Sequence, residues 1–217
     1  MAASARLARI QAALERLYDV RSELRVDDFL CDEEFTETVA PQATERGEVL
    51  LVTQREGDLS VGLYLSDTAL AELDTLADGD DAWLDERFGS ACLVTEGVSH
   101  FVYLVFRAND GGAVSLLELE LQAEVDKYAT ALLAGNGVGA IRERSRAIRG
   151  RLFADAKYLD AAGTEEGDRY RLATRLAARF AERLEREHLG ADDLDGLART
   201  LRRFYRLGAR EKIEAIG

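Results

Sequence analysis

The sequence contains few of the residue types on which several common kinds of site depend. Of its 28 basic residues only three are lysine, and it has one proline, one tryptophan, two cysteines and two histidines. Cys31 and Cys92 stand far apart without CxxC spacing, so they cannot supply the closely spaced soft ligands of a structural zinc site. Two such cysteines are typical of a reducing compartment, and they predict a cytoplasmic protein.

Long apolar runs are also missing from the sequence. The longest is Phe101 to Phe106, which is far shorter than the roughly 20 residues of a membrane-spanning helix. The N-terminal residues carry scattered arginines rather than the unbroken apolar core of a signal peptide. We therefore expect neither a membrane segment nor a signal peptide.

The familiar catalytic and nucleotide-binding motifs are incomplete. The glycine-rich stretch 135–139 lacks both the GxGxxG spacing and the lysine of a phosphate-binding loop. An EF-hand starting at Asp74 would place Leu76, which has no ligand oxygen, at a calcium-binding position. Ser99 and His100 are neighbours on a predicted strand, so their side chains should face opposite ways. The sequence thus predicts no catalytic residue, no metal site and no cofactor.

Charge is plentiful but unevenly distributed. The formal net charge is −13, which favours solubility and argues against a general nucleic-acid binder. Residues 1–137 hold 10 basic and 27 acidic residues, a charge of −17, whereas residues 138–217 hold 18 and 14, a charge of +4. This asymmetry suggests two regions, an acidic α+β domain over 1–137 and a helical C-terminal region over 138–217 that docks on it.

Hydrophobic periodicity predicts the elements of the acidic region. Apolar residues three and four positions apart indicate an amphipathic helix over 4–24. The stretches 48–54 and 59–65 predict a first β-hairpin, and the second of them alternates apolar and polar residues. The stretches 91–96 and 100–107 predict a second hairpin, whose last strand is apolar on both faces and should be central.

The rest of the chain is predicted to be helical. Ser115 followed by Glu118 forms a capping-box pattern that should open a helix over 115–133. Further helices are expected over about 140–160, 166–188 and 192–207 from their apolar stripes. The predicted fold class is therefore α+β, with an antiparallel sheet of two β-hairpins packed with helices, followed by a helical C-terminal region.

One group of residues could form a site near the predicted second hairpin. The candidate ligand-binding residues are His100, Glu96, Glu120 and Glu124. Two carboxylates one helical turn apart, together with a histidine, can bind a metal ion or transfer protons. In the alternative interpretation, Glu120 and Glu124 belong to a solvated helix face, and His100 is a core or strand-end histidine. The sequence leaves both open, although about 100° per residue prevents Glu118 and Glu120 from pointing into one cleft.

Arginines recur every three or four residues on two predicted helices of the C-terminal region. The candidate partner-contacting or anion-contacting residues are Arg171, Arg175, Arg179, Arg183, Arg142, Arg146 and Arg149. Like charges one turn apart destabilise an isolated helix by about 0.2–0.5 kcal/mol per pair, so carboxylates should compensate them. We expect those carboxylates to belong to residues 1–137; an acidic partner or phosphate groups are the alternative.

Three functional hypotheses follow. The first is a soluble, non-catalytic interaction or regulatory protein, an adaptor or chaperone-like module, whose partner is another protein or a second copy of itself. The second is a small-molecule or metal-dependent enzyme or sensor with a site near His100 and the 115–133 helix. The third is an anion-binding or nucleic-acid-binding protein that uses the arginine rows; the overall acidity argues against nucleic acid, and we expect no membrane partner.

Overall fold

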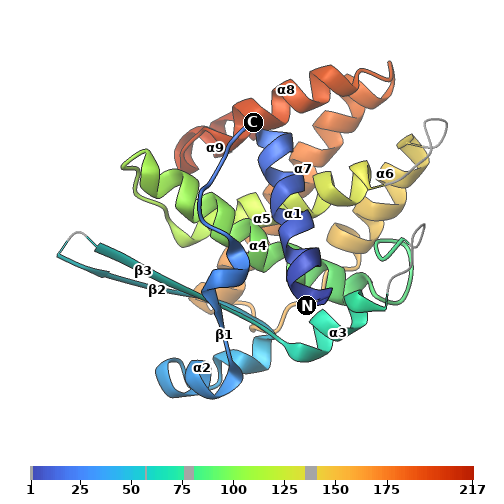
Figure 1. Ribbon diagram of the computed structural model, residues 1–217. Helices are drawn as coiled ribbons and strands as arrows, with labels where there is room; N and C mark the ends of the chain where they lie inside the picture. Colours follow the sequence, from blue (N-terminus) through green and yellow to red (C-terminus); the bar gives the residue numbers. More distant parts are fainter. Residues whose placement is uncertain (1, 57, 76–80, 135–140) are drawn as a thin grey trace.

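The computed structural model describes residues 2–56, 58–75, 81–134 and 141–217 (Figure 1). Its α-helices are α1 (Ala2–Tyr18), α2 (Glu33–Val39), α3 (Asp67–Asp74), α4 (Phe88–Asn109), α5 (Leu116–Leu133), α6 (Ile141–Arg149), α7 (Glu165–Leu184), α8 (Leu194–Tyr205) and α9 (Ala209–Ile216). Its strands are β1 (Leu30–Cys31), β2 (Glu48–Arg55) and β3 (Asp58–Leu65). The α+β fold class with a helical C-terminal region is confirmed.

The sheet contains the first predicted hairpin. Strands β2 and β3 pair antiparallel, and the short β1 adds to the other side of β3 in parallel, which gives the order β1-β3-β2. The far end of the hairpin projects beyond the helices (Figure 1). At the near end Leu63, Tyr64 and Leu65 are buried, so only this half of the hairpin belongs to the core.

The predicted second hairpin is wrong, because residues 88–109 form the single 22-residue helix α4. The stretch is rich in β-branched and aromatic residues, which favours a strand by local propensity. However, a helix that is covered on most sides is apolar all round, and over a short window this looks the same as a strand covered on both faces. Val102 and Leu104, which we expected in a central strand, are buried in this helix instead.

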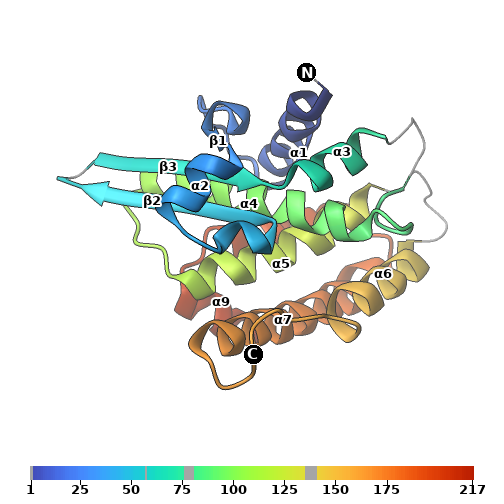
Figure 2. The ribbon, with the colours of Figure 1, turned by 90° about the horizontal axis from the view of Figure 1, so that it is seen from below.

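Helix α4 is also long and apolar enough to cross a membrane by length and composition alone. In the structure, 67% of its most apolar 18-residue window is buried by the surrounding chain. Figure 2 shows the sheet, α4, α5 and α7 as successive layers, which makes α4 the central helix between the sheet and the helical layers.

Helix caps fix where α3 and α5 begin. The Ser66 hydroxyl accepts a hydrogen bond from the Ala69 amide, and the Ser115 hydroxyl accepts one from the Glu118 amide. The cap at Ser115 was expected from the sequence, because a hydroxyl satisfies an otherwise unpaired amide of the first turn. The cap of α5 fixes the residue at which this helix begins.

The C-terminal helices complete the core. Helix α7 packs against α5, and α8 packs against α1, so buried residues from both halves of the chain form one continuous apolar cluster. At the α1–α8 contact the rings of Tyr18 and Tyr205 stack with centroids 3.9 Å apart. The predicted boundary between residues 137 and 138, like the glycine-rich stretch 135–139, lies outside the described residues.

Several polar side chains are buried where α1, α4, α5 and α9 meet. Asp126 accepts hydrogen bonds from Tyr18, from Ser99 at 2.5 Å and from Gln122 at 2.7 Å. The Lys212 ammonium donates to the Gln122 carbonyl oxygen and lies 4.4 Å from the centre of the Phe204 ring. These bonds join the two ends of the chain through the interior and serve the packing of α9.

Candidate functional site

A cluster of ionisable side chains lies where β2, α4, α5 and α7 meet. Glu96 and His100 are one turn apart on α4, and Glu120 and Glu124 are one turn apart on α5. Residues four apart share one helix face, so each helix presents two polar groups to the other. Glu48, the first residue of β2, approaches from the sheet. The structure thus brings together all four candidate ligand-binding residues and adds a fifth.

His100 is the centre of this cluster. Its Nδ1 lies 3.3 Å from Oε1 of Glu48, and its Nε2 lies 3.7 Å from Oε2 of Glu120. The side chain is 7% exposed, and Nε2 has no hydrogen-bond partner among the residues that the structure describes. Glu120 is also close to a cation from α7, since its Oε1 lies 3.7 Å from Nε of Arg169.

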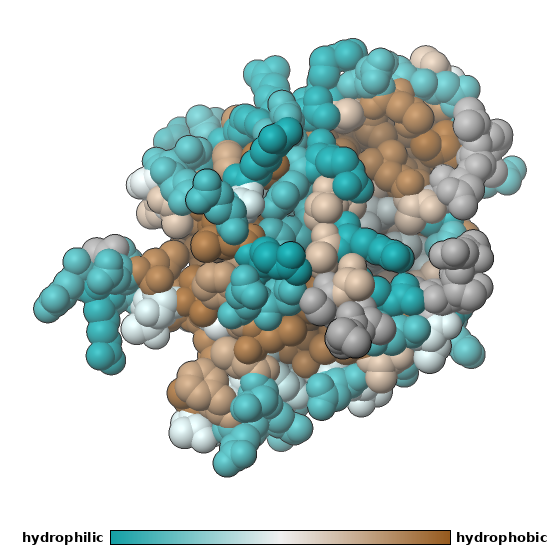
Figure 3. All heavy atoms as spheres, viewed as in Figure 1, coloured by the Kyte–Doolittle hydropathy of each residue, from teal (hydrophilic) through white to brown (hydrophobic). Residues whose placement is uncertain are grey.

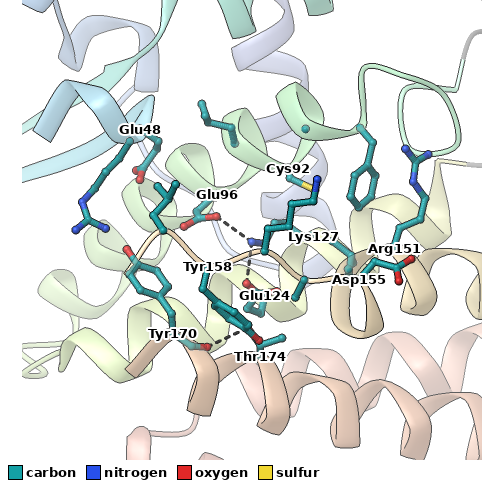
Figure 4. A pocket seen from close by; sticks show the side chains of 18 of the residues that line it. Glu48, Cys92, Glu96, Glu124, Lys127, Arg151, Asp155, Tyr158, Tyr170 and Thr174 are labelled. Atoms are coloured by element: carbon teal, nitrogen blue, oxygen red, sulfur yellow. Dashed lines mark hydrogen bonds and ion pairs between the residues drawn. The ribbon is translucent and has the colours of Figure 1, made fainter. Parts of the chain in front are cut away.

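Lys127 occupies the neighbouring end of the cluster. Its ammonium lies 2.8 Å from Glu96 Oε2 and 2.9 Å from Glu124 Oε1 (Figure 4). Burial opposes the charged form of a lysine, but Glu124 and Glu96 outweigh it and hold the pKa of Lys127 well above its usual value. Lys127 therefore stays charged, so it acts as a fixed cation rather than as an amine nucleophile.

The carboxylates also change how readily His100 accepts a proton. Burial by itself would lower the pKa of His100, but Glu48, Glu120 and Glu96 outweigh burial and raise the pKa to about 9. Burial raises the pKa of Glu120 to about 7, although His100 opposes this shift. Lys127 and His100 overcome burial and hold the pKa of Glu96 below its usual value.

A cavity of about 550 Å³ opens beside the cluster. Its walls come from α4, α5, α7, the start of β2 and the segment 155–160 that precedes α7. Side chains reach into the cavity from several directions (Figure 4). The apolar and aromatic part of the wall includes Phe88, Leu93, Leu152, Tyr158 and Tyr170, and the charged part includes Glu48, Glu96, Glu124, Lys127 and Arg151. Mostly apolar walls with a few convergent polar groups are typical of small-molecule sites.

The segment 155–160 is held across one side of the cavity by an arginine. Arg46 makes two contacts with Asp160, Nη1 to Oδ2 at 2.9 Å and Nη2 to Oδ1 at 3.0 Å, and its Nη2 also lies 3.1 Å from Glu166. A bidentate pair of this kind fixes orientation as well as distance. It ties the wall formed by this segment to the sheet side of the cavity.

The remaining polar group of the α4 wall is a poor nucleophile. Burial raises the pKa of Cys92 to about 12, and the reactive form of cysteine is the thiolate. The chemistry offered here is therefore that of the carboxylates that line the cavity and of the His100 imidazole behind them, groups that transfer protons or bind metal ions.

A metal ion could be held by three of these residues. One ligand atom each from Glu48, Glu96 and His100 lies within 4.8 Å of the other two. Carboxylate oxygens and imidazole nitrogens together suit divalent ions such as Mn²⁺, Fe²⁺ and Zn²⁺.

The burial of Glu120 decides one alternative left open by the sequence, and two residues of the cluster had been missed. Glu120 is 6% exposed, so the interpretation of its helix face as solvated is wrong. Glu118 points away from the cavity and contacts Tyr103, as the helical angle required. Glu48 and Lys127 were not among the predicted site residues. Glu48 is distant from the others in the sequence, and a lone lysine on a helix gives no signal of a site.

The arginine rows lie elsewhere. Arg149 pairs with Glu182 and Glu185, and Arg183 pairs with Glu187. These carboxylates belong to the C-terminal region itself. Arg142, Arg175 and Arg179 are exposed, Arg146 lies 3.8 Å from Glu185, and Arg171 stacks on Tyr158.

Other arginines make the ion pairs between the two regions. Arg144 pairs with Asp81, and Arg169 pairs with Glu120. The C-terminal arginines that face the acidic region therefore lie outside the predicted candidates.

Comparisons with protein-family models, with curated proteins and with solved structures found no match for this chain.

Proposed function

We propose that this protein is a small-molecule enzyme or sensor whose site is the cavity between α4, α5 and α7. The observation that carries this proposal is the position of the ionisable cluster. Glu48, Glu96, Glu124 and Lys127 line the cavity, and charged side chains are rarely buried unless they are paired or have a function. A purely structural cluster has no need of an adjoining cavity of about 550 Å³.

The composition of the wall supports proton transfer or metal-assisted chemistry on a molecule with an apolar body. Aromatic rings such as Tyr158 and Tyr170 offer flat apolar contacts. Glu96 and Lys127 offer one negative and one positive group at the end of the cavity, which would orient a polar end of the ligand. A hydrolase that uses Cys92 as its nucleophile is not favoured, because burial raises the pKa of this thiol to about 12.

A bulky residue at the rim tests this proposal. Gly89 lines the cavity, and a Cβ atom added there meets nothing within 4 Å, so Gly89→Trp can reach over the cavity without disturbing the helix. Thermal-shift measurements with a panel of small metabolites should find compounds that stabilise the wild type. The same compounds should leave the melting temperature of Gly89→Trp unchanged.

Gly190→Trp is the matched control, because a Cβ atom there also meets nothing within 4 Å and the residue does not line the cavity. The control should respond to ligands as the wild type does. Stabilising compounds that act equally on all three proteins, or a complete lack of stabilising compounds, would contradict the proposal.

Protein contact is a second candidate function, and one observation favours it. Large apolar side chains are exposed between residues 24 and 59: Leu24, Leu30, Phe35, Val39, Val52 and Leu59. Brown, apolar area is visible among hydrophilic residues next to the projecting hairpin (Figure 3). Contiguous exposed apolar surface often marks an interface, and self-association is its simplest form.

Analytical ultracentrifugation tests this candidate. Phe35 and Val39 are 52% and 51% exposed on α2, so Phe35→Asp with Val39→Asp should not disturb the core. The double variant should sediment as a monomer at concentrations where the wild type forms dimers. A wild type that stays monomeric at all concentrations would argue against self-association through this surface.

A further inference from the structure

We propose that Glu48, Glu96 and His100 bind one divalent metal ion of the Mn²⁺ or Fe²⁺ class, at the end of the cavity. This inference deepens the proposed function and rests on the same cavity, but it makes a separate claim, since a small molecule could bind there without a metal. Three independent features of the cluster support it: the spacing of the ligand atoms, the unsatisfied imidazole and the balance of charge.

The spacing of the ligand atoms fits one ion. Two ligands that each lie about 2.1 Å from a metal are separated by roughly 3–4 Å. Glu48 Oε1 and His100 Nδ1 are 3.3 Å apart. One ligand atom each of Glu48, Glu96 and His100 lies within 4.8 Å of the other two. A small rotation of the Glu96 carboxylate would complete the set. Glu96 and His100 are on one rigid helix, and Glu48 begins a strand, so the site is held by regular elements.

The second feature is the unsatisfied imidazole nitrogen of His100. A histidine that binds a metal usually donates its other ring N–H to a carboxylate, which fixes the ring. Nε2 of His100 is buried and makes no hydrogen bond within the described ranges of the chain, and Oε2 of Glu120 lies 3.7 Å from it. With Nδ1 on the ion, Nε2–H faces Glu120, whose other oxygen lies near Arg169. Glu120 is therefore a positioning residue, not a ligand.

The third feature is an excess of negative charge in a buried place. Four carboxylates, Glu48, Glu96, Glu120 and Glu124, converge here. Within the described part of the chain, the lysine and arginine side chains that pair with them are those of Lys127 and Arg169. Buried charges are costly unless they are paired. One divalent cation balances the difference when His100 is neutral, which is the form that binds a metal.

Lys127 limits the site to one ion. Its ammonium lies between Glu96 and Glu124, 2.8 Å and 2.9 Å from their oxygens, which is where a second cation would be expected. The protein's own cation therefore replaces a second metal. Because Glu48 and Glu96 also line the cavity, the remaining coordination positions face the space where a water or substrate group can bind.

Manganese binding to the full-length protein tests the proposal. After removal of metals with a chelator, Mn²⁺ should bind with a stoichiometry of one by calorimetry and change the electron paramagnetic resonance spectrum of the free ion. Glu48→Gln, Glu96→Gln and His100→Gln should each lower the affinity by more than about 100-fold, and Glu120→Gln by about 10–100-fold, as is typical behind a ligating histidine. Circular dichroism checks that each variant is folded.

Glu124→Gln is the matched control, because it removes the same charge from the same cluster but not from the proposed ligand set. Its affinity for Mn²⁺ should change by less than about tenfold, which is below the loss expected even for Glu120→Gln. Equal losses in Glu124→Gln and Glu48→Gln would show diffuse attraction and overturn the proposal, as would a wild type with no saturable Mn²⁺ binding.

The cavity can be tested apart from the metal. If metabolites stabilise the wild type but not Gly89→Trp in the presence of the chelator, the small-molecule site stands whatever the result with Mn²⁺. Saturable Mn²⁺ binding in a protein that no metabolite stabilises would show the reverse, a metal site without the proposed function.

Discussion

Lys212 illustrates how the burial of one charged side chain can set a pH dependence for the fold. The residue is fully buried, and burial lowers its pKa to about 7, although Asp126 and Glu118 oppose the shift. An unfolded lysine has a pKa of about 10.4. Between these values the unfolded chain binds more protons than the folded one, so this residue makes stability rise with pH.

Lys212→Met should remove that rise. The free energy of unfolding of the wild type, relative to that of the variant, should increase between pH 7 and pH 10 with a slope of at most about 1.4 kcal/mol per pH unit. His100 has the opposite effect, because the stabilisation linked to its raised pKa is lost between about pH 6.5 and about pH 9. This contribution is the same in both proteins and cancels in the difference. Urea unfolding at several pH values measures the free energy of unfolding of the wild type and of Lys212→Met. If the two curves of stability against pH run parallel, Lys212 does not cause the rise.

The sequence indicated most of the cluster residues but not their arrangement. Glu96, His100, Glu120 and Glu124 could be named because carboxylates and histidines are the residue types that such sites use. Their convergence depends on α4 being a helix, which places Glu96 and His100 on one face. Glu48 could not be identified, because its contact with His100 joins residues 52 positions apart and comes only from tertiary packing.

Among the elements, α4 is the one for which sequence and structure differ most, and Gly97 explains part of the difference. In the predicted second hairpin this glycine lay in the connection between the two strands. In the structure it lies inside the helix, where a Cβ atom would be 2.8 Å from Leu65 and 3.0 Å from Glu48. The glycine thus permits close packing of α4 on the sheet, a requirement that local propensity does not show.

Gly97→Ala tests this packing. An exposed helix position would gain about 1 kcal/mol from the change to alanine, but at Gly97 we expect a loss of about 1–3 kcal/mol from overpacking. Gly89→Ala, on the same helix with nothing within 4 Å of the new Cβ, should be neutral or stabilising. The urea concentration at the midpoint of unfolding, measured for both variants and the wild type, shows the effect of each change on stability. A stabilised Gly97→Ala would contradict the close approach of helix and sheet.

Elements with local signals were predicted well. The second strand of the first hairpin alternates apolar and polar residues, and Ser115 marks a helix start by a side-chain bond to a nearby amide. Such signals act within a few residues. The short strand β1 pairs in parallel with β3, from Leu30 to Leu63, and a pairing over that separation has no comparable local signal.

Across the whole molecule, the two halves of the chain share one core. Arg202 donates to the Leu17 carbonyl oxygen at 2.8 Å, and Arg206 donates to that of Tyr18 at 3.0 Å. Apolar burial contributes about 25 cal/mol per Å², whereas exposed ion pairs contribute about 0–1 kcal/mol each. The shared apolar cluster, rather than the arginine rows, should therefore hold the helical region in place.

Expression of residues 138–217 alone tests this conclusion. The fragment should be poorly folded, because the apolar faces of α7 and α8 lose their cover from α5 and α1. Addition of residues 1–137 should restore cooperative unfolding, as followed by circular dichroism. A fragment that is monomeric and unfolds cooperatively by itself would instead indicate an independent domain.

The central claim is that the chemistry of this protein is concentrated where Glu48, Glu96 and His100 meet the cavity. A crystal grown with Mn²⁺ and measured for anomalous scattering tests it most directly. We expect one strong anomalous peak bonded to both carboxylates and to the imidazole, with its open side towards Tyr158 and Tyr170. A peak at another position, or an empty cluster at saturating Mn²⁺, would contradict it.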